Sequence, residues 1–299
     1  MILMTTETKT KVKFAPELLD PKYNKLRKPS LPYGIIINDR YAGILIPTEQ
    51  LETAEWRRMP TEEQLTTVEL TEPVTGLLLR RCRIIVLACV TEYVRWKDIE
   101  ENGEQAGEVI GLYDNYRNSL DKKSQEVCSE HALIFLSRKN QLLHKVPIVV
   151  RFKNVALWSF KSAREDFYRK LEKTFAEYNN IEYSGKDDKW RSLGVLEVEF
   201  KGVKEGQNRN KSYCCKTNNI TEPTLENLAS LFLGQTKQLK KIWKLHNSIA
   251  GFVESEENQL PALAASKGEV VPTREARRVE VEVLEDEFDQ FDEEELLEE

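Results

Sequence analysis

Residues 146–178 read VPIVVRFKNVALWSFKSAREDFYRKLEKTFAEY, and the period of the hydrophobic pattern changes within this stretch. In VPIVVRFK apolar side chains alternate, with arginine and lysine on the opposite face, which predicts a half-buried strand. Ser162 and Glu165 then match a helix capping box. Apolar residues behind them recur at helical spacing, so we expect an amphipathic helix over residues 163–178.

The rest of the chain shows strands before and after this unit, without a regular strand–helix–strand alternation. We therefore expect an α+β protein whose mostly antiparallel sheet curls into an OB-like barrel with flanking helices. An apolar run at 132–136 fits either a strand or a helix. The expected strands are 34–37, 43–47, 65–70, 74–93, 196–202 and 211–217, and the expected helices are 48–56 and 225–252, the second divided at Gly234.

Composition divides the chain into four segments. Residues 1–29 are rich in lysine and threonine, and we expect a flexible basic arm. Residues 30–252 form one α+β body, the expected nucleic-acid-binding domain. Residues 253–279 have no core pattern and are expected to form a flexible linker. Residues 280–299 form an acidic interaction tail, and we expect both termini to be disordered.

Charge is divided unevenly between this tail and the rest of the chain. The chain has 44 basic and 50 acidic residues, a formal net charge of −6. Residues 280–299 hold 12 of the acids and no base, which leaves 44 bases against 38 acids before them. Such asymmetry favours nucleic-acid contact or an interaction tail, whereas a tail that only keeps the protein soluble is the simpler explanation.

Catalytic motifs are absent: the sequence has no phosphate-binding glycine loop, no zinc-protease motif and no serine-hydrolase motif. We therefore expect no enzyme activity and no cofactor. No apolar run approaches the roughly 20 residues that span a bilayer, and the five cysteines form no Cys-x-x-Cys pair. These features predict a cytoplasmic protein without membrane contact. Glu197 and Glu199, near Lys201, are the best candidates for the metal ligands of a nuclease, although strand alternation alone explains their pattern.

Positive charge is interleaved with aromatic rings in the second half of the chain. Lysine and arginine bind phosphates, and exposed rings stack on bases at about 1–3 kcal/mol per base whatever the base sequence. Phe152, Phe167 and Phe175 lie on apolar stripes and are assigned to the core. The candidate nucleic-acid-binding residues are Arg151, Lys153, Trp158, Phe160, Lys161, Arg164, Lys189, Trp190, Arg191, Arg209, Lys211, Tyr213 and Lys216.

The last sixteen residues, LEDEFDQFDEEELLEE, place phenylalanines among carboxylates. Such a tail can occupy a cationic groove in place of phosphates, or anchor its rings in a hydrophobic pocket of another protein. The candidate partner-binding residues are Leu284, Phe288, Phe291 and Leu296. The tail resembles that of bacterial and phage single-stranded-DNA-binding proteins, which implies an OB barrel that holds DNA and a tail that recruits replication and repair enzymes. Here, however, the phenylalanines are internal.

Three further stretches carry a second resemblance: LPYGIIINDRYAGILIPTEQL, LHKVPIVVRFKNVALWSF and WRSLGVLEVEF. They resemble an uncharacterised family of proteins from filamentous cyanobacteria, a domain of unknown function. The resemblance covers residues 30 to about 250 and implies one continuous domain, without implying an activity.

These patterns predict a protein that binds single-stranded DNA or RNA without sequence specificity. Its acidic tail is expected to compete with the nucleic acid and to recruit a protein partner. The alternative is an adaptor that binds protein through the tail or through the helix of Trp243, without nucleic acid. A metal-dependent nuclease is the third hypothesis.

Overall fold

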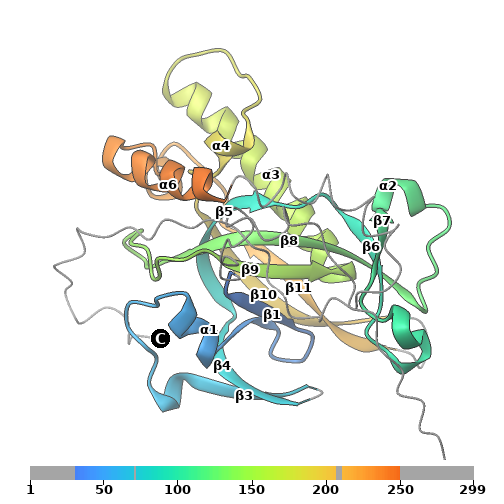
Figure 1. Cartoon of the computed structure of the whole chain (residues 1–299). Helices are drawn as coiled ribbons and strands as arrows, with labels where there is room; N and C mark the ends of the chain where they lie inside the picture. Colours follow the sequence, from blue (N-terminus) through green and yellow to red (C-terminus); the bar gives the residue numbers. More distant parts are fainter. Residues whose placement is uncertain (1–30, 71, 207–210, 250–299) are drawn as a thin grey trace, which may run out of the picture.

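A large mixed sheet forms the centre of the molecule, and helices lie against both of its faces (Figure 1). The structure, a computed structural model, describes residues 31–70, 72–206 and 211–249. Within them the predicted α+β class is confirmed. The expected basic arm, linker and acidic tail, and the disorder expected of the termini, lie outside the described residues.

The predicted elements appear in the predicted order, but the expected strand 74–93 is divided into two strands, and several short elements were not predicted. The strands are β1 Tyr33–Ile37, β2 Gly43–Pro47, β3 Leu65–Glu69, β4 Pro73–Leu79, β5 Arg81–Cys89, β6 Tyr93–Trp96, β7 Val109–Leu112, β8 Gln125–Leu136, β9 Ile148–Lys153, β10 Leu196–Glu205 and β11 Ser212–Ile220. The α-helices are α1 Thr48–Thr53, α2 Tyr113–Tyr116, α3 Asn154–Tyr178, α4 Asp188–Arg191, α5 Leu228–Leu231 and α6 Thr236–Ser248, and the short 3₁₀ helices are η3 Glu62–Gln64 and η4 Glu100–Gln105.

The sheet is open. Its strands follow the order β11-β10-β5-β8-β9-β1-β2-β4-β3, and the short strands β6 and β7 branch from β8. The pairing of β1 with β9 is parallel, and the other pairings between described strands are antiparallel. The expected closure into an OB-like barrel is not seen, because β11 and β3 end the path without pairing to each other.

The unit of β9 and α3 differs from its prediction at one point. The strand is confirmed, but α3 begins at Asn154, nine residues before the expected start at Ala163. The capping-box assignment is therefore wrong, and Ser162 and Glu165 lie inside the helix. Buried residues at helical spacing extend the apolar stripe to the strand, and the Asn154 side chain accepts a hydrogen bond from Val127 N (3.2 Å). These buried residues are Ala156, Leu157 and Phe160.

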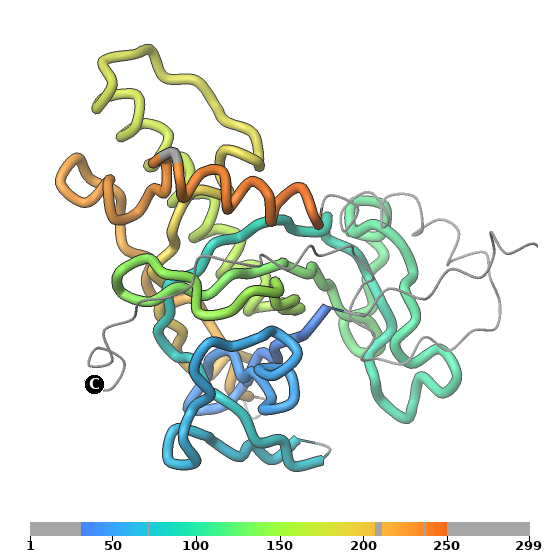
Figure 2. The backbone as a smooth tube through the Cα atoms, turned by 60° about the vertical axis from the view of Figure 1, so that its left-hand side comes forward, coloured from blue at the N-terminus to red at the C-terminus, as the bar shows by residue number. Residues whose placement is uncertain are grey.

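The two faces of the sheet carry separate cores. On one face α3 packs over β5, β8, β9 and β10. On the other face helix α6 lies beside β5 (Figures 1 and 2). Ile242, Leu245 and Ile249, in or just after this helix, are buried there with residues of β5 and β8. Strand β8 is buried on both faces along almost its whole length. This double burial explains why the run at 132–136 lacks the alternation that identifies a strand.

Hydrogen bonds hold the β1–β2 turn and the β4–β5 junction against the β10–β11 hairpin. The Asn38 side chain of the turn accepts a hydrogen bond from Cys215 N (2.8 Å), and Phe200 N donates to Arg80 O at the junction (2.8 Å). Gly202 permits this approach, because an added Cβ would overlap the carbonyl oxygen of Asp39. The contact brings two segments more than 150 residues apart in sequence onto one part of the surface.

Candidate nucleic-acid interface

The four bases predicted on β9 and α3 all have carboxylate partners. Three of the carboxylates belong to β8 or to the segment before β6, so distant parts of the chain neutralise a positive run in the sequence. A phosphate would have to displace these partners. The pairs are Arg151 with Glu130 (2.6 Å), Lys153 with Glu126 (2.9 Å), Lys161 with Glu92 (2.7 Å) and Arg164 with Glu165 (2.8 Å).

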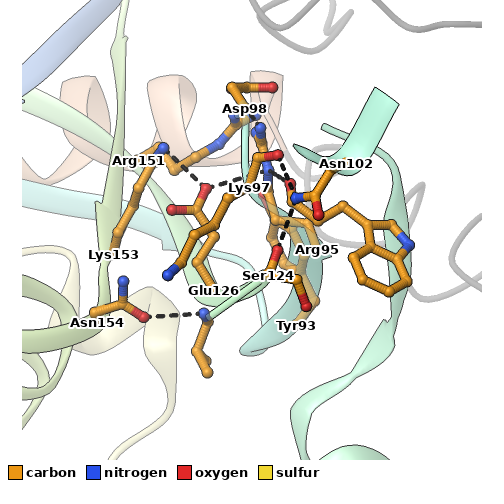
Figure 3. Close-up of polar contacts among 12 residues, drawn as sticks. Tyr93, Arg95, Lys97, Asp98, Asn102, Ser124, Glu126, Arg151, Lys153 and Asn154 are labelled. Carbon is orange, nitrogen blue, oxygen red and sulfur yellow. Dashed lines mark hydrogen bonds and ion pairs between the residues drawn. The ribbon is translucent and has the colours of Figure 1, made fainter. Parts of the chain in front are cut away.

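Arg151 and Lys153 belong to a larger polar network across β6, β8 and β9 (Figure 3). Arg95 is at its centre, with a side chain only 2% exposed, and lies 2.6 Å from Asp98 and 3.3 Å from Glu126. Tyr93 donates to Glu130, which also pairs with Arg151. The alternation of charges on one sheet face balances the buried cations, so this network is a structural feature of the sheet.

The two aromatic candidates on α3 lie in different environments. Phe160 is 0% exposed and stacks on Phe152 at 4.3 Å between ring centroids. It belongs to the core, and its assignment to base stacking does not fit this burial. Trp158 is 39% exposed and packs at a tilt on Tyr113, with Lys161 Nζ 5.7 Å from its ring centroid. Trp158 thus keeps one accessible aromatic surface beside a cation.

The candidates on α4 contribute mainly to packing. The Trp190 ring is half-buried against Phe175 and Phe232. Arg191 pairs with Glu172 (2.9 Å) and lies over the ring of Tyr168. Lys189 Nζ lies 5.0 Å from the ring centroid of Trp243 on α6. This group therefore joins α3, α4 and α6 and offers little open surface.

The candidates on the β10–β11 hairpin remain closest to solvent. Lys211 is exposed, and Tyr213 is half-buried with Lys204 Nζ 5.1 Å from its ring centroid. Lys216 pairs with Glu205 (3.1 Å). Arg209 lies outside the described residues.

Beside this hairpin the structure places an aromatic site that the sequence patterns did not reveal. Tyr41, in the β1–β2 turn, is 54% exposed, and its ring lies near two guanidinium groups. Arg40 and Arg80 each approach the ring centroid to 5.6 Å. In the sequence, Arg40 and Tyr41 are adjacent, but an Arg–Tyr pair in a turn is too common to identify a site. Arg80 comes close to them only in the folded protein.

We define the hairpin surface as the β1–β2 turn together with the β4–β5 junction and the β10–β11 hairpin. Strand pairing puts Lys201 and Lys216 on one face of the hairpin and Lys204 and Tyr213 on the other. Among the described residues this surface has seven bases and four acids, with Glu197, Glu199 and Glu205 already in ion pairs. Its bases are Arg40, Arg80, Arg81, Lys201, Lys204, Lys211 and Lys216, and its acids are Asp39, Glu197, Glu199 and Glu205.

The local excess contrasts with the body as a whole. Residues 31–249 contain 33 bases and 30 acids, so the body is close to neutral. Part of the basic excess predicted for residues 1–279 comes from residues 1–30, which have seven bases and three acids. Positive potential on the body therefore depends on where the bases gather in space, and the hairpin surface is one such place.

The carboxylates proposed for a nuclease have arginine partners. Glu197 pairs with Arg83 and Glu199 with Arg81, each at 3.1 Å across the β5–β10 ladder. Hydrogen bonds from Asn218 and Arg81 hold the pKa of Glu199 below its ordinary value. Among the residues that the structure describes, no group of three or more His, Cys, Asp or Glu side chains is arranged to hold a metal ion.

The adaptor hypothesis depends on the acidic tail or on the helix of Trp243, and only the helix lies within the described residues. Leu284, Phe288, Phe291 and Leu296 of the tail lie outside the described residues. On α6, Trp243 is half-buried and donates its indole N–H to Lys189 O (2.9 Å), so it is already used in packing.

Two findings concern the expected absence of membrane contact and the expected reducing compartment. Within the described ranges, no helix combines the length and the apolarity needed to cross a membrane. All five cysteines are free of disulfide bonds. Cys215 is buried and its neighbour Cys214 half-buried, as expected for adjacent strand residues on opposite faces.

Comparison with known proteins assigns the chain to a family. A family model described as a domain of unknown function, DUF5895, matches residues 28–264, and the chain belongs to this family. The expected domain of unknown function is thus confirmed over most of the chain. The chain is also similar to an uncharacterised protein, 254L, of Invertebrate iridescent virus 6, with 25% identity over 151 residues. That match covers 48% of this chain and 45% of the viral protein, so the chain spans less than half of its relative. No solved structure matches the chain.

Proposed function

We propose that this member of the DUF5895 family binds single-stranded nucleic acid, without sequence specificity, through the hairpin surface. The observation that carries the proposal is the 54% exposed ring of Tyr41, with the guanidinium groups of Arg40 and Arg80 each 5.6 Å from its centroid. An exposed ring beside two cations offers a stacking surface for a base and positive charge for the neighbouring phosphates. Lys204, on the hairpin face that carries Tyr213, and Lys211 just before β11 extend the positive charge along the hairpin.

A single strand fits this surface better than a duplex does. Bases in a duplex are stacked on one another, whereas a single strand exposes its base faces to a ring such as that of Tyr41. An exposed ring recognises any base because every base has a π face, and no base-edge readout is needed. DNA and RNA are both candidate ligands. The proposal does not require a closed OB barrel.

The acidic segment 280–299 completes the proposal as a competitor and recruiter. Its 12 acids resemble a short run of phosphates, so it is expected to compete with nucleic acid for positive surfaces of the body. When nucleic acid displaces the segment, Phe288 and Phe291 become available to a protein partner. Truncation after Val279 is therefore expected to tighten nucleic-acid binding.

The test is fluorescence anisotropy with labelled oligo-dT of about 30 nucleotides, at two salt concentrations and against a matched duplex. We expect Tyr41→Ala to weaken single-strand binding by about 1–3 kcal/mol, or roughly 5- to 150-fold. The double variant Arg80→Ala/Lys204→Ala removes two phosphate contacts and should flatten the slope of log K against log salt by about 1.4.

Tyr178→Ala is the matched control, because Tyr178 is a 65% exposed tyrosine at the end of α3, on another element. This variant should bind like the wild type. Binding that is absent, insensitive to salt, or equally weakened by the two tyrosine substitutions would refute the assignment.

A protein-interaction adaptor is the second candidate function, and one feature favours it. The end of α3 and the segment after it expose Tyr178, Ile181 and Tyr183, three large apolar side chains close together in sequence. In Figure 1 this segment projects from the body above α4. Failure of the wild-type protein to bind oligo-dT would favour this candidate. A cytoplasmic location is proposed for either function, since free cysteines fit a reducing compartment.

A further inference from the structure

Helix α6 presents a row of lysines on the side opposite its buried residues. Lys237, Lys240, Lys241 and Lys244 are spaced i, i+3, i+4 and i+7, which places them on one helix face. Lys237, Lys240 and Lys244 are exposed, and Lys241 is half-buried. The helix contains no acid. We call these four residues the α6 lysine face.

The opposite side of α6 is occupied by the fold. Ile242 and Leu245 of α6 and Ile249 just after it are buried in the core on the second face of the sheet. Trp243 faces α4, because its indole N–H donates to Lys189 O (2.9 Å) and Lys189 Nζ lies 5.0 Å from its ring centroid. A partner that approaches α6 from solvent therefore meets ammonium groups, and the partner that suits them is acidic.

We infer that the α6 lysine face binds the acidic segment 280–299 of the same chain. The segment has 12 acids and no base, whereas residues 250–279 have five acids and four bases. The charge that complements α6 is thus confined to the last twenty residues. Tethering to the same chain raises the effective concentration of the segment at α6 without any additional contact.

The connecting length allows this contact. Between Ser248 and Glu280 there are 31 residues, which span on the order of 100 Å when fully extended. The 13 residues of α6 extend over about 20 Å. The connection is therefore long enough to bring the acidic segment back alongside the helix in either direction.

The α6 lysine face suits a long run of acids better than the hairpin surface does. Four acids are interspersed among the bases of the hairpin surface, and Glu197, Glu199 and Glu205 already pair with cations. The acids of the hairpin surface would repel a run of carboxylates, whereas α6 itself contains no acid. The inference rests on the proposed function and adds where the competing segment binds. The segment then competes only with the part of a bound strand that extends from the hairpin surface to α6.

The test is zero-length carbodiimide cross-linking of the full chain without nucleic acid, followed by peptide mass spectrometry. The reagent joins a lysine amine to a carboxylate only when the two are in contact. We expect cross-links from Lys237, Lys240 and Lys244 to acids of residues 280–299, and their loss at 1 M salt, where the screening length is about 3 Å. A mixture of unlabelled and ¹⁵N-labelled protein separates links within one chain from links between chains.

Charge reversal supplies the matched pair of variants. Lys237→Glu/Lys240→Glu should reduce the remaining cross-links at Lys244 by about fivefold or more. Lys201→Glu/Lys204→Glu, on the hairpin surface, should leave the α6 cross-links unchanged.

The inference is overturned by any of three results. These are cross-links of the acidic segment mainly to hairpin lysines, the absence of salt-sensitive links to α6, and links only between differently labelled copies. Because no nucleic acid is present, loss of these cross-links leaves the proposed function standing. Loss of oligo-dT binding with the cross-links intact would instead refute the proposed function alone.

Discussion

Glu126 is the residue whose neutralisation should reveal most about the network on β6, β8 and β9. Glu126→Gln keeps the shape of the side chain and removes its charge. Glu126 Oε1 lies 2.9 Å from Lys153 Nζ and 3.3 Å from Arg95 Nε, and these contacts are ion pairs by distance without aligned hydrogen bonds. The Glu126 and Arg95 side chains are only 8% and 2% exposed. The variant therefore leaves a buried guanidinium with less compensating charge.

The loss of unfolding free energy depends on the partners that Lys153 and Arg95 retain in the variant. Breaking a buried ion pair by removing one partner costs about 3–5 kcal/mol. Lys153 is 38% exposed and can turn to water, and Arg95 keeps Asp98 at 2.6 Å. We therefore expect the lower end, about 3 kcal/mol of unfolding free energy. For a domain of this size that corresponds to a fall in Tm of about 6–12 °C.

Urea denaturation followed by tryptophan fluorescence measures this loss, and the m-value should not change. Glu199→Gln is the control, since its partner Arg81 is 74% exposed and an exposed pair contributes at most about 1 kcal/mol. The reasoning is refuted if Glu126→Gln costs no more than Glu199→Gln. A further check is Arg95→Met/Glu126→Leu, which removes both charges and should cost less than Glu126→Gln alone.

Three further predictions concern the core, the pH dependence and the contact that supports the hairpin surface. Phe160→Ala should cost about 3–5 kcal/mol of unfolding free energy in urea, and Trp158→Ala on the same helix clearly less, because only Phe160 is fully buried. Burial lowers the pKa of His144 to about 4, so the stability gained by keeping this imidazole neutral is complete above about pH 6.5 and is lost as the pH falls through 4. Up to about 3 kcal/mol of unfolding free energy should be lost over that range. In urea melts between pH 7 and pH 4 the unfolding free energy of His144→Gln should depend less on pH than that of the wild type, and an equal dependence would contradict the assignment. Gly202→Ala should destabilise the fold by about 1–3 kcal/mol and weaken oligo-dT binding, because the new Cβ pushes the turn of Tyr41 away from β10, whereas Gly185→Ala, with open space around it, should do neither.

Local sequence patterns were sufficient to predict an element when its own residues show which of its faces is buried. The strand at β9, the strands β1 and β2, and the division of the last helical region near Gly234 all agree with the sequence prediction. Alternation and helical spacing depend only on which face of an element is buried, and that information is local. The start of α3 was misplaced because the capping-box residues Ser162 and Glu165 also occur inside helices, and the stripe of buried residues before them was the stronger signal.

The candidate site was only partly predictable. Lys211, Tyr213 and Lys216 were nominated from sequence, and the structure places all three on the hairpin surface. Tyr41, Arg40 and Arg80 were missed, because the cluster forms only when the β1–β2 turn packs on β10. Conversely, Arg151 and Lys153 were nominated although β8 supplies the carboxylates that pair with them.

The sequence by itself determined the α+β class, most element positions, the separation of the acidic segment from the body, and the absence of familiar catalytic motifs. Those properties are sums or periods along the chain. Only the tertiary structure decided that the sheet stays open, that Phe160 is core, and which positive charges are neutralised by distant carboxylates. The physical reason is that electrostatic pairing and ring exposure depend on distances through space, and strand pairing brings together residues such as Arg83 and Glu197 that are 114 positions apart.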